Sequence, residues 1–266
     1  MIGELSQKEY KWLLEKVGYI SASCGDDLMA NGRKGQLWGE TAITYLYKLQ
    51  RERMRGIPSP QLSAKPMTFG NENEPYAIEW LRRNVNPDIK NCSEDFDEKL
   101  FRKHDIVSVG ASPDAILGTP DNVNNIYERK SVYGEKETNW MFSPTVPYAE
   151  KKAEVLKDHR NQIAIQLLVY PECNAISLMK YDPQRDDNQF DNLDPMDPSR
   201  GLVFDFTRED FSLYLVDVWK RILIADAFLK YGYNPDNVNE YYYKIYADDE
   251  GVVPGKYYGV IFEKNE

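Results

Sequence analysis

The sequence has 266 residues, with 33 Lys and Arg against 43 Asp and Glu, which gives a net charge of −10 at neutral pH. Hydrophobic residues make up 42% and aromatic residues 13% of the chain, a composition too apolar for a disordered protein. The length suits one large domain or two small ones. No stretch approaches the roughly 20 apolar residues of a membrane helix, and the start lacks the order of a secretion signal. We therefore expect a cytoplasmic protein that does not bind a membrane.

Cysteine and histidine content speaks against several kinds of site. The three cysteines, Cys24, Cys92 and Cys173, lie far apart in the sequence, and their odd number argues against a disulfide framework. The chain has only two histidines, so a zinc or iron–sulfur site is not expected. The acidity is uneven: residues 1–60 carry nine basic and seven acidic residues, whereas residues 181–250 carry seven and sixteen. The first half of the chain therefore remains able to bind an anionic ligand.

Helices are predicted in the first third of the chain. Apolar residues at helical spacing predict a short helix that ends near Gly18, and Ser21 or Ser23 is suited to cap a second one. A longer helix is predicted from Trp38 to Arg55, with Gly56 as its end. The next is predicted to start at Pro75, because proline is favoured at the first helical position.

The rest of the chain alternates strand-like and helix-like segments. Residues 106–112 and 125–132 are rich in β-branched and aromatic residues, and the turn-forming residues between them predict a hairpin. The following segments are predicted in order: helix 160–170, strand 175–181, an acidic loop 182–199, strand 202–206, helix 209–230 and a tyrosine-rich tail. This order predicts an α/β (mixed α+β) fold with a central mixed sheet flanked by helices. We expect one domain over residues 1–231 and an extension, 232–266, packed on it.

Two carboxylates and a lysine form the most informative pattern. Pro113-Asp114 is followed, after thirteen residues, by Glu128-Arg129-Lys130. In a strand, Glu128 and Lys130 point to the same side and Arg129 to the other. If Asp114 lies at the neighbouring edge, two carboxylates able to bind Mg²⁺ meet an ammonium group able to orient water, a set suited to phosphodiester hydrolysis.

Taken alone, this PD-(D/E)xK pattern has low specificity. Asp88 with Asp97 and Lys99, and Asp121 with Glu150 and Lys152, match it too, but neither second half lies in a convincing strand. A turn aspartate beside a solvated strand edge also explains the Asp114 set. Glu74 before Pro75 suits either a metal or the charge at a helix N-terminus. Gln162 and Gln166, one turn apart in an apolar helix, suit either water positioning or hydrogen bonds in the core.

A wider set of residues resembles the family of the phage lambda-type, YqaJ-type viral recombinase nucleases within the PD-(D/E)xK superfamily. The matching residues occur in the family's order between residues 12 and 231: Trp12, Ile-Ser-Ala-Ser at 20–23, Arg33, FGNENEP at 69–75, ASPD at 111–114, ERK at 128–130, Gln162 and KYDP at 180–183. The resemblance implies a restriction-endonuclease-like core, a phage or prophage origin and a ring of three subunits around duplex DNA.

The resemblance also assigns roles to single residues. It implies that Asp114, Glu128 and the backbone carbonyl of Arg129 bind one Mg²⁺, that Glu74 serves a second ion, and that Lys130 and Gln162 position the attacking water. Mn²⁺ is expected to substitute for Mg²⁺. Further positions that match DNA phosphate contacts in the family are Ser23, Arg33, Ser112 and Lys16. At Lys16 the family has an arginine, so the grip on a 5′ phosphate lacks the bidentate guanidinium.

Three functional hypotheses follow. The first is a Mg²⁺-dependent 5′→3′ exonuclease on linear double-stranded DNA that releases 5′ mononucleotides and leaves a 3′ single strand for an annealing protein. The second is a DNA endonuclease on the same core. The third is a DNA-binding module without catalytic activity, which the complete set of Asp114, Glu128 and Lys130 disfavours because unpaired buried charges are costly. Among the remaining polar residues, His159 is expected at the surface, and the tyrosines at 241–243 are expected to pack on the domain.

Overall fold

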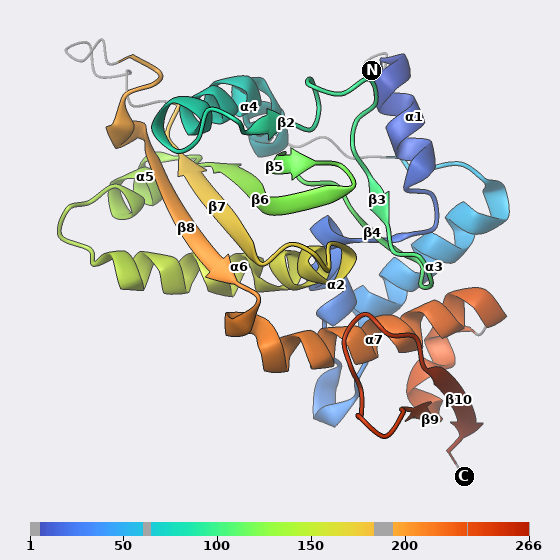
Figure 1. Cartoon of the computed structure of the whole chain (residues 1–266). Helices are drawn as coiled ribbons and strands as arrows, with labels where there is room; N and C mark the ends of the chain where they lie inside the picture. The colour runs from blue at the N-terminus through green and yellow to red at the C-terminus, as the bar shows by residue number, and fades with distance from the viewer. Residues whose placement is uncertain (1–5, 61–64, 184–193, 233, 266) are drawn as a thin grey trace.

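The computed structural model describes residues 6–60, 65–183, 194–232 and 234–265 (Figure 1). Its helices are α1 (Gln7–Glu15), α2 (Gly25–Met29), α3 (Glu40–Arg55), α4 (Lys65–Asn84), α5 (Glu135–Met141), α6 (Tyr148–Val169) and α7 (Ser212–Tyr231). Its strands are β1 (Ile20–Ser21), β2 (Lys90–Asn91), β3 (Arg102–Lys103), β4 (Val109–Ala111), β5 (Ala115–Thr119), β6 (Asn122–Ser131), β7 (Ala175–Tyr181), β8 (Gly201–Thr207), β9 (Tyr241–Tyr246) and β10 (Gly259–Lys264). Most of the acidic loop predicted at 182–199 lies outside the described residues.

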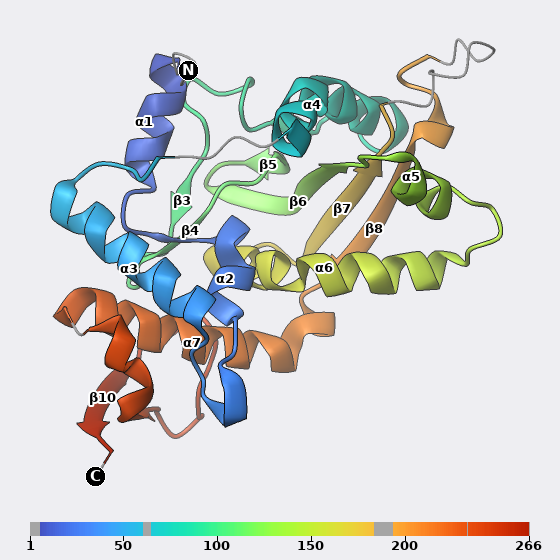
Figure 2. The same cartoon turned by 180° about the vertical axis from the view of Figure 1, so that it is seen from behind.

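The centre of the fold is a five-stranded mixed sheet in the order β2-β5-β6-β7-β8. β6 and β7 are parallel, whereas the other neighbours are antiparallel. α5 and α6 form the crossover that a parallel pair requires. Figures 1 and 2 show α4 on one face of this sheet and α6 on the other. The predicted fold class, a mixed sheet flanked by helices, is confirmed.

Successive side chains of β6 point alternately to the two helix layers that cover the sheet. Ile126 belongs to the larger apolar core, which contains α6, while Tyr127 belongs to the smaller core under α4. Side chains of successive strand residues point to opposite faces, so each residue of β6 is assigned to one layer. Glu128 and Lys130 therefore belong to the α6 side, and Arg129 to the α4 side.

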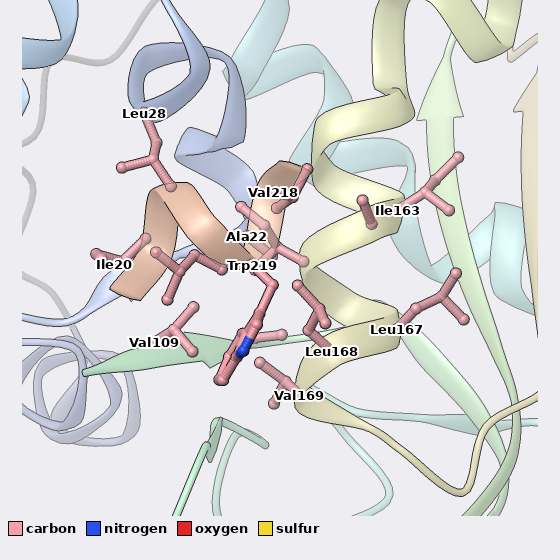
Figure 3. Close-up of a cluster of buried hydrophobic side chains, with 14 of the residues drawn as sticks. Ile20, Ala22, Leu28, Val109, Ile163, Leu167, Leu168, Val169, Val218 and Trp219 are labelled. Atoms are coloured by element: carbon pink, nitrogen blue, oxygen red, sulfur yellow. The ribbon is translucent and has the colours of Figure 1, made fainter. Parts of the chain in front are cut away.

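The larger core is built around α6 and α7. Figure 3 shows Leu168 and Val169 of α6 on the side of Trp219 of α7, whereas Ile163 and Leu167 point to the opposite side of the helix. The last seven residues of α6 are buried, as are twelve residues of α7. No helix in the part of the chain that the structure describes is both long and apolar enough to span a membrane.

The predicted hairpin has a different first strand. β6 pairs with β5, which occupies the segment 115–119 that the sequence interpretation treated as turn-forming. The earlier strand-like segment supplies β4, which pairs with β1 and β3 in a separate small sheet. Glycine and proline concealed the short strand in the sequence: Gly118, at φ +116°, lies within its five residues, and Pro120 follows it directly.

The predicted start of the fourth helix is wrong. α4 begins at Lys65, ten residues before Pro75, which lies inside the helix. Proline in a helix interior removes one backbone hydrogen bond and costs about 3 kcal/mol. The buried face that follows, Ala77, Ile78 and Leu81, holds the helix on the sheet in spite of this cost.

Several boundaries agree closely with the sequence. The strand predicted at 175–181 is β7, and the helix predicted to end at Arg55 is α3, whose cap Gly56 is left-handed with φ +66°. α6 starts at Tyr148, twelve residues before the predicted helix, because its first half is polar and carries no apolar periodicity. Neither Ser21 nor Ser23 caps a helix through its side chain; Ser21 precedes a short 3-10 turn instead.

The C-terminal segment packs against α7 and α3. β9 and β10 form an antiparallel hairpin, and the Phe262 ring lies 4.4 Å from that of Phe228. Trp219 Nε1 donates to the backbone oxygen of Lys256 at 2.8 Å, and Tyr258 is buried. Tyr243 is half-buried and packs on the core, as predicted, whereas Tyr242 remains exposed.

Candidate active site

Asp114 and Glu128 meet at one end of the β5–β6 hairpin. Ala115 pairs with Tyr127 in the antiparallel register, so the preceding Asp114 is placed opposite Glu128. Asp114 Oδ2 accepts a hydrogen bond from the backbone N–H of Arg129 at 2.8 Å. The short connection that follows β4 therefore delivers one carboxylate to the strand that carries the other.

Glu128 is the centre of a polar cluster on the α6 side of the sheet. Its side chain is only 2% exposed. Its Oε2 accepts a hydrogen bond from Gln162 Nε2 at 2.5 Å and lies 3.5 Å from Lys130 Nζ. Its Oε1 accepts a hydrogen bond from Gln166 Nε2. Both glutamines predicted from the apolar helix thus bind the same carboxylate.

Burial and then the neighbouring charge of Asp114 raise the pKa of Glu128 to about 7, while Lys130 opposes the shift. Two carboxylates therefore share a buried site with one ammonium group. The negative charge of this site is not balanced by its protein neighbours, which favours a divalent cation between the carboxylates.

Glu74 lies on the other face of the sheet and is held by Arg129. Glu74 Oε2 accepts a hydrogen bond from Arg129 Nη2 at 2.9 Å, and Glu74 Oε1 accepts one from Ser93 Oγ at 3.1 Å. Arg129 Nη1 also donates to the backbone oxygen of Gly70 at 2.6 Å. The side chain of Arg129 thus points away from Lys130, as strand alternation predicts, and connects α4 to the catalytic strand.

The oxygen atoms around Asp114 are of the type that binds a hard metal ion. Asp114, Glu128 and the carbonyl of Arg129 are oxygen ligands on adjacent chain segments, the type that Mg²⁺ prefers. Within the described ranges, no three side chains of His, Cys, Asp or Glu form a ready metal-binding group. All three acids nevertheless lie around Cys92: the pKa of its thiol is raised first by burial and then by the charges of Asp114, Glu128 and Glu74. The oxygen set fits a hard cation bound at Asp114 and Glu128, with Glu74 nearby.

A second cluster surrounds Ser112, two residues before Asp114. Ser112 Oγ accepts a hydrogen bond from Trp12 Nε1 at 3.1 Å and donates one to the backbone oxygen of Leu100 at 2.5 Å. Two lysines lie over the ring of Trp12: Lys16 Nζ is 4.1 Å and Lys99 Nζ 4.2 Å from its centroid. Indole, hydroxyl and ammonium groups thus gather at the edge of the carboxylate site.

Burial, together with the charges of Lys99 and Lys48, lowers the pKa of Lys16 to about 8. Lys16 and Lys99 both lie over the ring of Trp12, and two ammonium groups this close together attract an anion. Lys48 and Lys99 were not predicted from the sequence, because isolated lysines on a helix and in an acidic loop carry no pattern.

Ser23 approaches the same region through strand pairing. β1 and β4 run parallel, with Ser21 opposite Gly110, so Ser23 and Ser112 both follow the carboxyl ends of paired strands. Ser23 Oγ lies 3.0 Å from Ser21 Oγ, and Ser23 itself is exposed. Three of the four predicted phosphate contacts, Lys16, Ser23 and Ser112, therefore lie near the carboxylates.

Arg33 lies apart, on the exposed loop between α2 and α3. Arg221 of α7 holds the start of this loop by donating to the backbone oxygens of Leu28, at 2.9 Å, and Ala30, at 2.6 Å. Asn239 holds its end, because it bonds both the N–H and the carbonyl of Trp38. The structure thus presents Arg33 from a loop fixed at both ends.

His159 differs from its prediction as a surface residue. It is half-buried, and its Nε2 is buried without a hydrogen-bond partner in the described part of the chain. Burial, together with the charges of Lys130 and Lys180, lowers the pKa of His159 to about 3. The imidazole is therefore neutral and within range of the charge of Lys130, because one side of the polar half of α6 turns toward the sheet.

The chain has no matching family model and no match among curated proteins. Among solved structures it is similar to the alkaline exonuclease LHK-Exo of Laribacter hongkongensis, with 18% identity, a TM-score of 0.56, and coverage of 84% of this chain and 93% of that one. A structure of LHK-Exo in complex with dAMP matches with 17% identity, a TM-score of 0.55 and the same coverage. A phage-related exonuclease from Haemophilus somnus 129PT matches with 15% identity, a TM-score of 0.55, and coverage of 80% and 94%. The chain therefore has the fold of these exonucleases.

Proposed function

We propose that this protein is a Mg²⁺-dependent 5′→3′ exonuclease that acts on linear double-stranded DNA and releases 5′ mononucleotides. The observation that carries the proposal is the meeting of Asp114, Glu128 and Lys130 at one end of the β5–β6 pair, with Gln162 bound to Glu128. The fold shared with solved exonucleases supports it, and one of those structures holds dAMP, the kind of product proposed here.

The chain's own groups would divide the work as follows. Asp114, Glu128 and the Arg129 carbonyl would bind one Mg²⁺, and Glu74 would serve a second after release from Arg129. When bound, two such ions supply charge stabilisation to the attacking and leaving oxygens. Lys130 Nζ orients the attacking water, and Gln162 and Gln166 hold the Glu128 carboxylate in place. The water oxygen joins phosphorus, and the P–O3′ bond breaks.

The lysine and serine cluster supports binding of the DNA end. Lys16, Lys99 and Ser112 lie beside the carboxylate site and offer ammonium and hydroxyl donors to a 5′ phosphate. Arg33, on its fixed loop, would contact a phosphate farther along the duplex. Because Lys16 is a point charge, we expect a weaker preference for phosphorylated ends than an arginine would give.

An assembly and a partner complete the proposal. Three copies of the 30.9 kDa chain would form a ring around the duplex, which makes digestion processive. The 3′ single strand would pass to an annealing protein. Sedimentation equilibrium tests the assembly: a trimer is expected, and a monomer at all concentrations would contradict it.

The decisive experiment uses linear duplex DNA labelled at either the 5′ or the 3′ end, with and without a 5′ phosphate, and closed circular DNA. We expect mononucleotide release from the 5′ ends of linear DNA in Mg²⁺, slower release in Mn²⁺ and no release in EDTA. The rate of release by Lys130→Ala should be at least about a hundredfold lower than that of the wild type. Lys136→Ala, an exposed lysine of α5, is the control and should digest at the wild-type rate. Cutting of circles would indicate an endonuclease, and no cleavage in any metal would leave DNA binding alone.

A further inference from the structure

A pocket of about 740 Å³ lies on the far side of α6 from the catalytic carboxylates. Its walls come from α2, α6, α7 and β9, the strand that belongs to the C-terminal extension. Arg160 and Asn161 of α6 line it, directly before Gln162. With 3.6 residues per turn, Arg160 points about 200° away from Gln162 around the helix, so the pocket and the carboxylate site use opposite faces of α6.

The pocket is basic in an acidic protein. Its lining contains four cationic side chains, Arg160, Lys220, Arg221 and Lys244, and one acid, Asp217. The whole chain carries a net charge of −10. A concentration of positive charge in a concave site of such a chain attracts an anion.

Three of these cations are available to a ligand. Arg221 is committed to the loop that carries Arg33, whereas Arg160, Lys220 and Lys244 are exposed. None of these three makes an ion pair with a carboxylate in the residues that the structure describes. Their charges are therefore not neutralised by a carboxylate of the described residues.

Aromatic rings lie among the cations. The guanidinium of Arg160 is 4.8 Å from the ring centroid of Tyr214. Tyr242 is 56% exposed and shares a side of β9 with Lys244, two residues on. An exposed tyrosine next to a lysine offers a stacking face for a base and a donor for its phosphate, the combination used by proteins that bind single-stranded nucleic acid.

We propose that this pocket binds one nucleotide unit, with the base against Tyr242 and the phosphate among Arg160, Lys220 and Lys244. Either a free mononucleotide or one nucleotide of a single DNA strand presents this chemistry. The ligand bound here is distinct from the scissile nucleotide, because α6 separates it from Glu128. This site does not depend on the proposed cleavage.

Binding in EDTA tests the proposal with the full-length protein. The probes are dAMP and a short thymidine oligonucleotide with a 5′ hydroxyl, which has no terminal phosphate for the Lys16 cluster. The pocket variant is Lys220→Gln with Lys244→Gln. The matched control, Lys11→Gln with Lys157→Gln, removes the same charge from exposed lysines outside the pocket that pair with Glu98 and Glu154. Thermal unfolding of both variants checks that each is folded.

We expect the pocket variant to bind about tenfold more weakly than the control, and the slope of log K against log salt for the oligonucleotide to fall by about 0.7 for the one phosphate that the pocket binds. If the pocket variant binds both probes more weakly than the control, the site is supported and a free nucleotide is sufficient as its ligand. If it binds only the oligonucleotide more weakly, the site is supported and its ligand is a single DNA strand. Ultraviolet cross-linking of a 5-bromouracil oligonucleotide should label the peptide with Tyr242. Equal affinities of the two variants for both probes would overturn the proposal, whether or not the protein cuts DNA.

Discussion

At the scale of single residues, opposing effects act on the charge of the Glu128 carboxylate. Its carboxylate is buried beside Asp114 and is held by two glutamine amides and one lysine. Hydrogen bonds to the charged form lower its pKa, but burial and the neighbouring carboxylate raise it to about 7. The folded protein therefore holds this proton more tightly than the unfolded chain, whose glutamate titrates near 4.5.

This linkage predicts a pH dependence of stability in EDTA. The contribution of Glu128 is fully present below pH 4.5 and is lost as the pH rises through about 7, because the charged form is disfavoured in the fold. Glu128→Gln should remove this part of the dependence, so the variant gains stability relative to wild type between these pH values. Urea denaturation at several pH values measures the effect. Parallel curves for the two proteins would contradict it.

Lys16 is a buried base, so burial lowers its pKa instead of raising it. Its pKa of about 8 means that the charge is lost as the pH rises from 7 to 9. We expect the preference of the wild type for 5′-phosphorylated over 5′-hydroxyl ends to fall over this range. Lys16→Arg should keep the preference at pH 9, because a guanidinium stays charged. Initial rates on the two substrates at each pH measure the ratio; an unchanged wild-type ratio would exclude Lys16 from the end-binding site.

At the scale of elements, the contact between β8 and α4 depends on one glycine. A Cβ atom at Gly201 would lie 2.6 Å from Cζ2 of Trp80, a buried ring whose Nε1 donates to the backbone oxygen of Asp197 at 2.7 Å. A strand this close to an indole leaves no room for a side chain. The glycine therefore sets how near α4 packs to the sheet, and with it the position of Glu74.

Gly201→Ala should destabilise the protein by about 1–3 kcal/mol, because the ring or the strand must move. Gly259→Ala in β10 is the control: its Cβ would meet only Tyr246, at an ordinary 3.7 Å, and a change within about 0.5 kcal/mol is expected. Chemical denaturation of both variants measures the difference. Equal stabilities would show that α4 is not seated as closely as the structure indicates.

At the scale of the whole molecule, the C-terminal segment is part of the main packing. Asn239 binds both backbone groups of Trp38, and Trp219 and Phe228 of α7 contact residues beyond 255. The extension thus covers α7, which directly precedes it, and contacts α3, which lies far from it in the sequence (Figure 2).

A truncated chain that ends at Gly232 should therefore be less stable than the full-length protein. The truncation would expose the apolar surface of Trp219 and Phe228 and leave the backbone groups of Trp38 without partners, each at a cost of about 1–3 kcal/mol. We expect a lower thermal midpoint and aggregation, measured by calorimetry and size-exclusion chromatography. An unchanged midpoint would show that residues 1–231 fold as an independent domain.

Local patterns were sufficient where one side of an element faces the core. The end of α3 at Gly56 follows from cap chemistry, and the direction of Arg129, away from Lys130 and toward α4, follows from strand alternation. Local patterns did not predict β5, because turn-forming residues lie within this paired strand. They also did not predict the start of α4, because the packing of Ile78 and Leu81 outweighs the cost of a proline inside the helix. Tertiary contacts decide such segments because their local preferences are weak or opposed.

The sequence by itself determined the fold class and singled out the groups proposed for the chemistry: two carboxylates and a lysine at strand spacing, and two glutamines one helical turn apart. Only the tertiary structure decided what these groups bind. It placed both glutamines on Glu128, paired Glu74 with Arg129, brought Lys48 and Lys99 to Lys16, and turned His159 toward Lys130. The physical reason is that residue type and period specify a side chain's direction on its own element, whereas its partner depends on how separate elements pack.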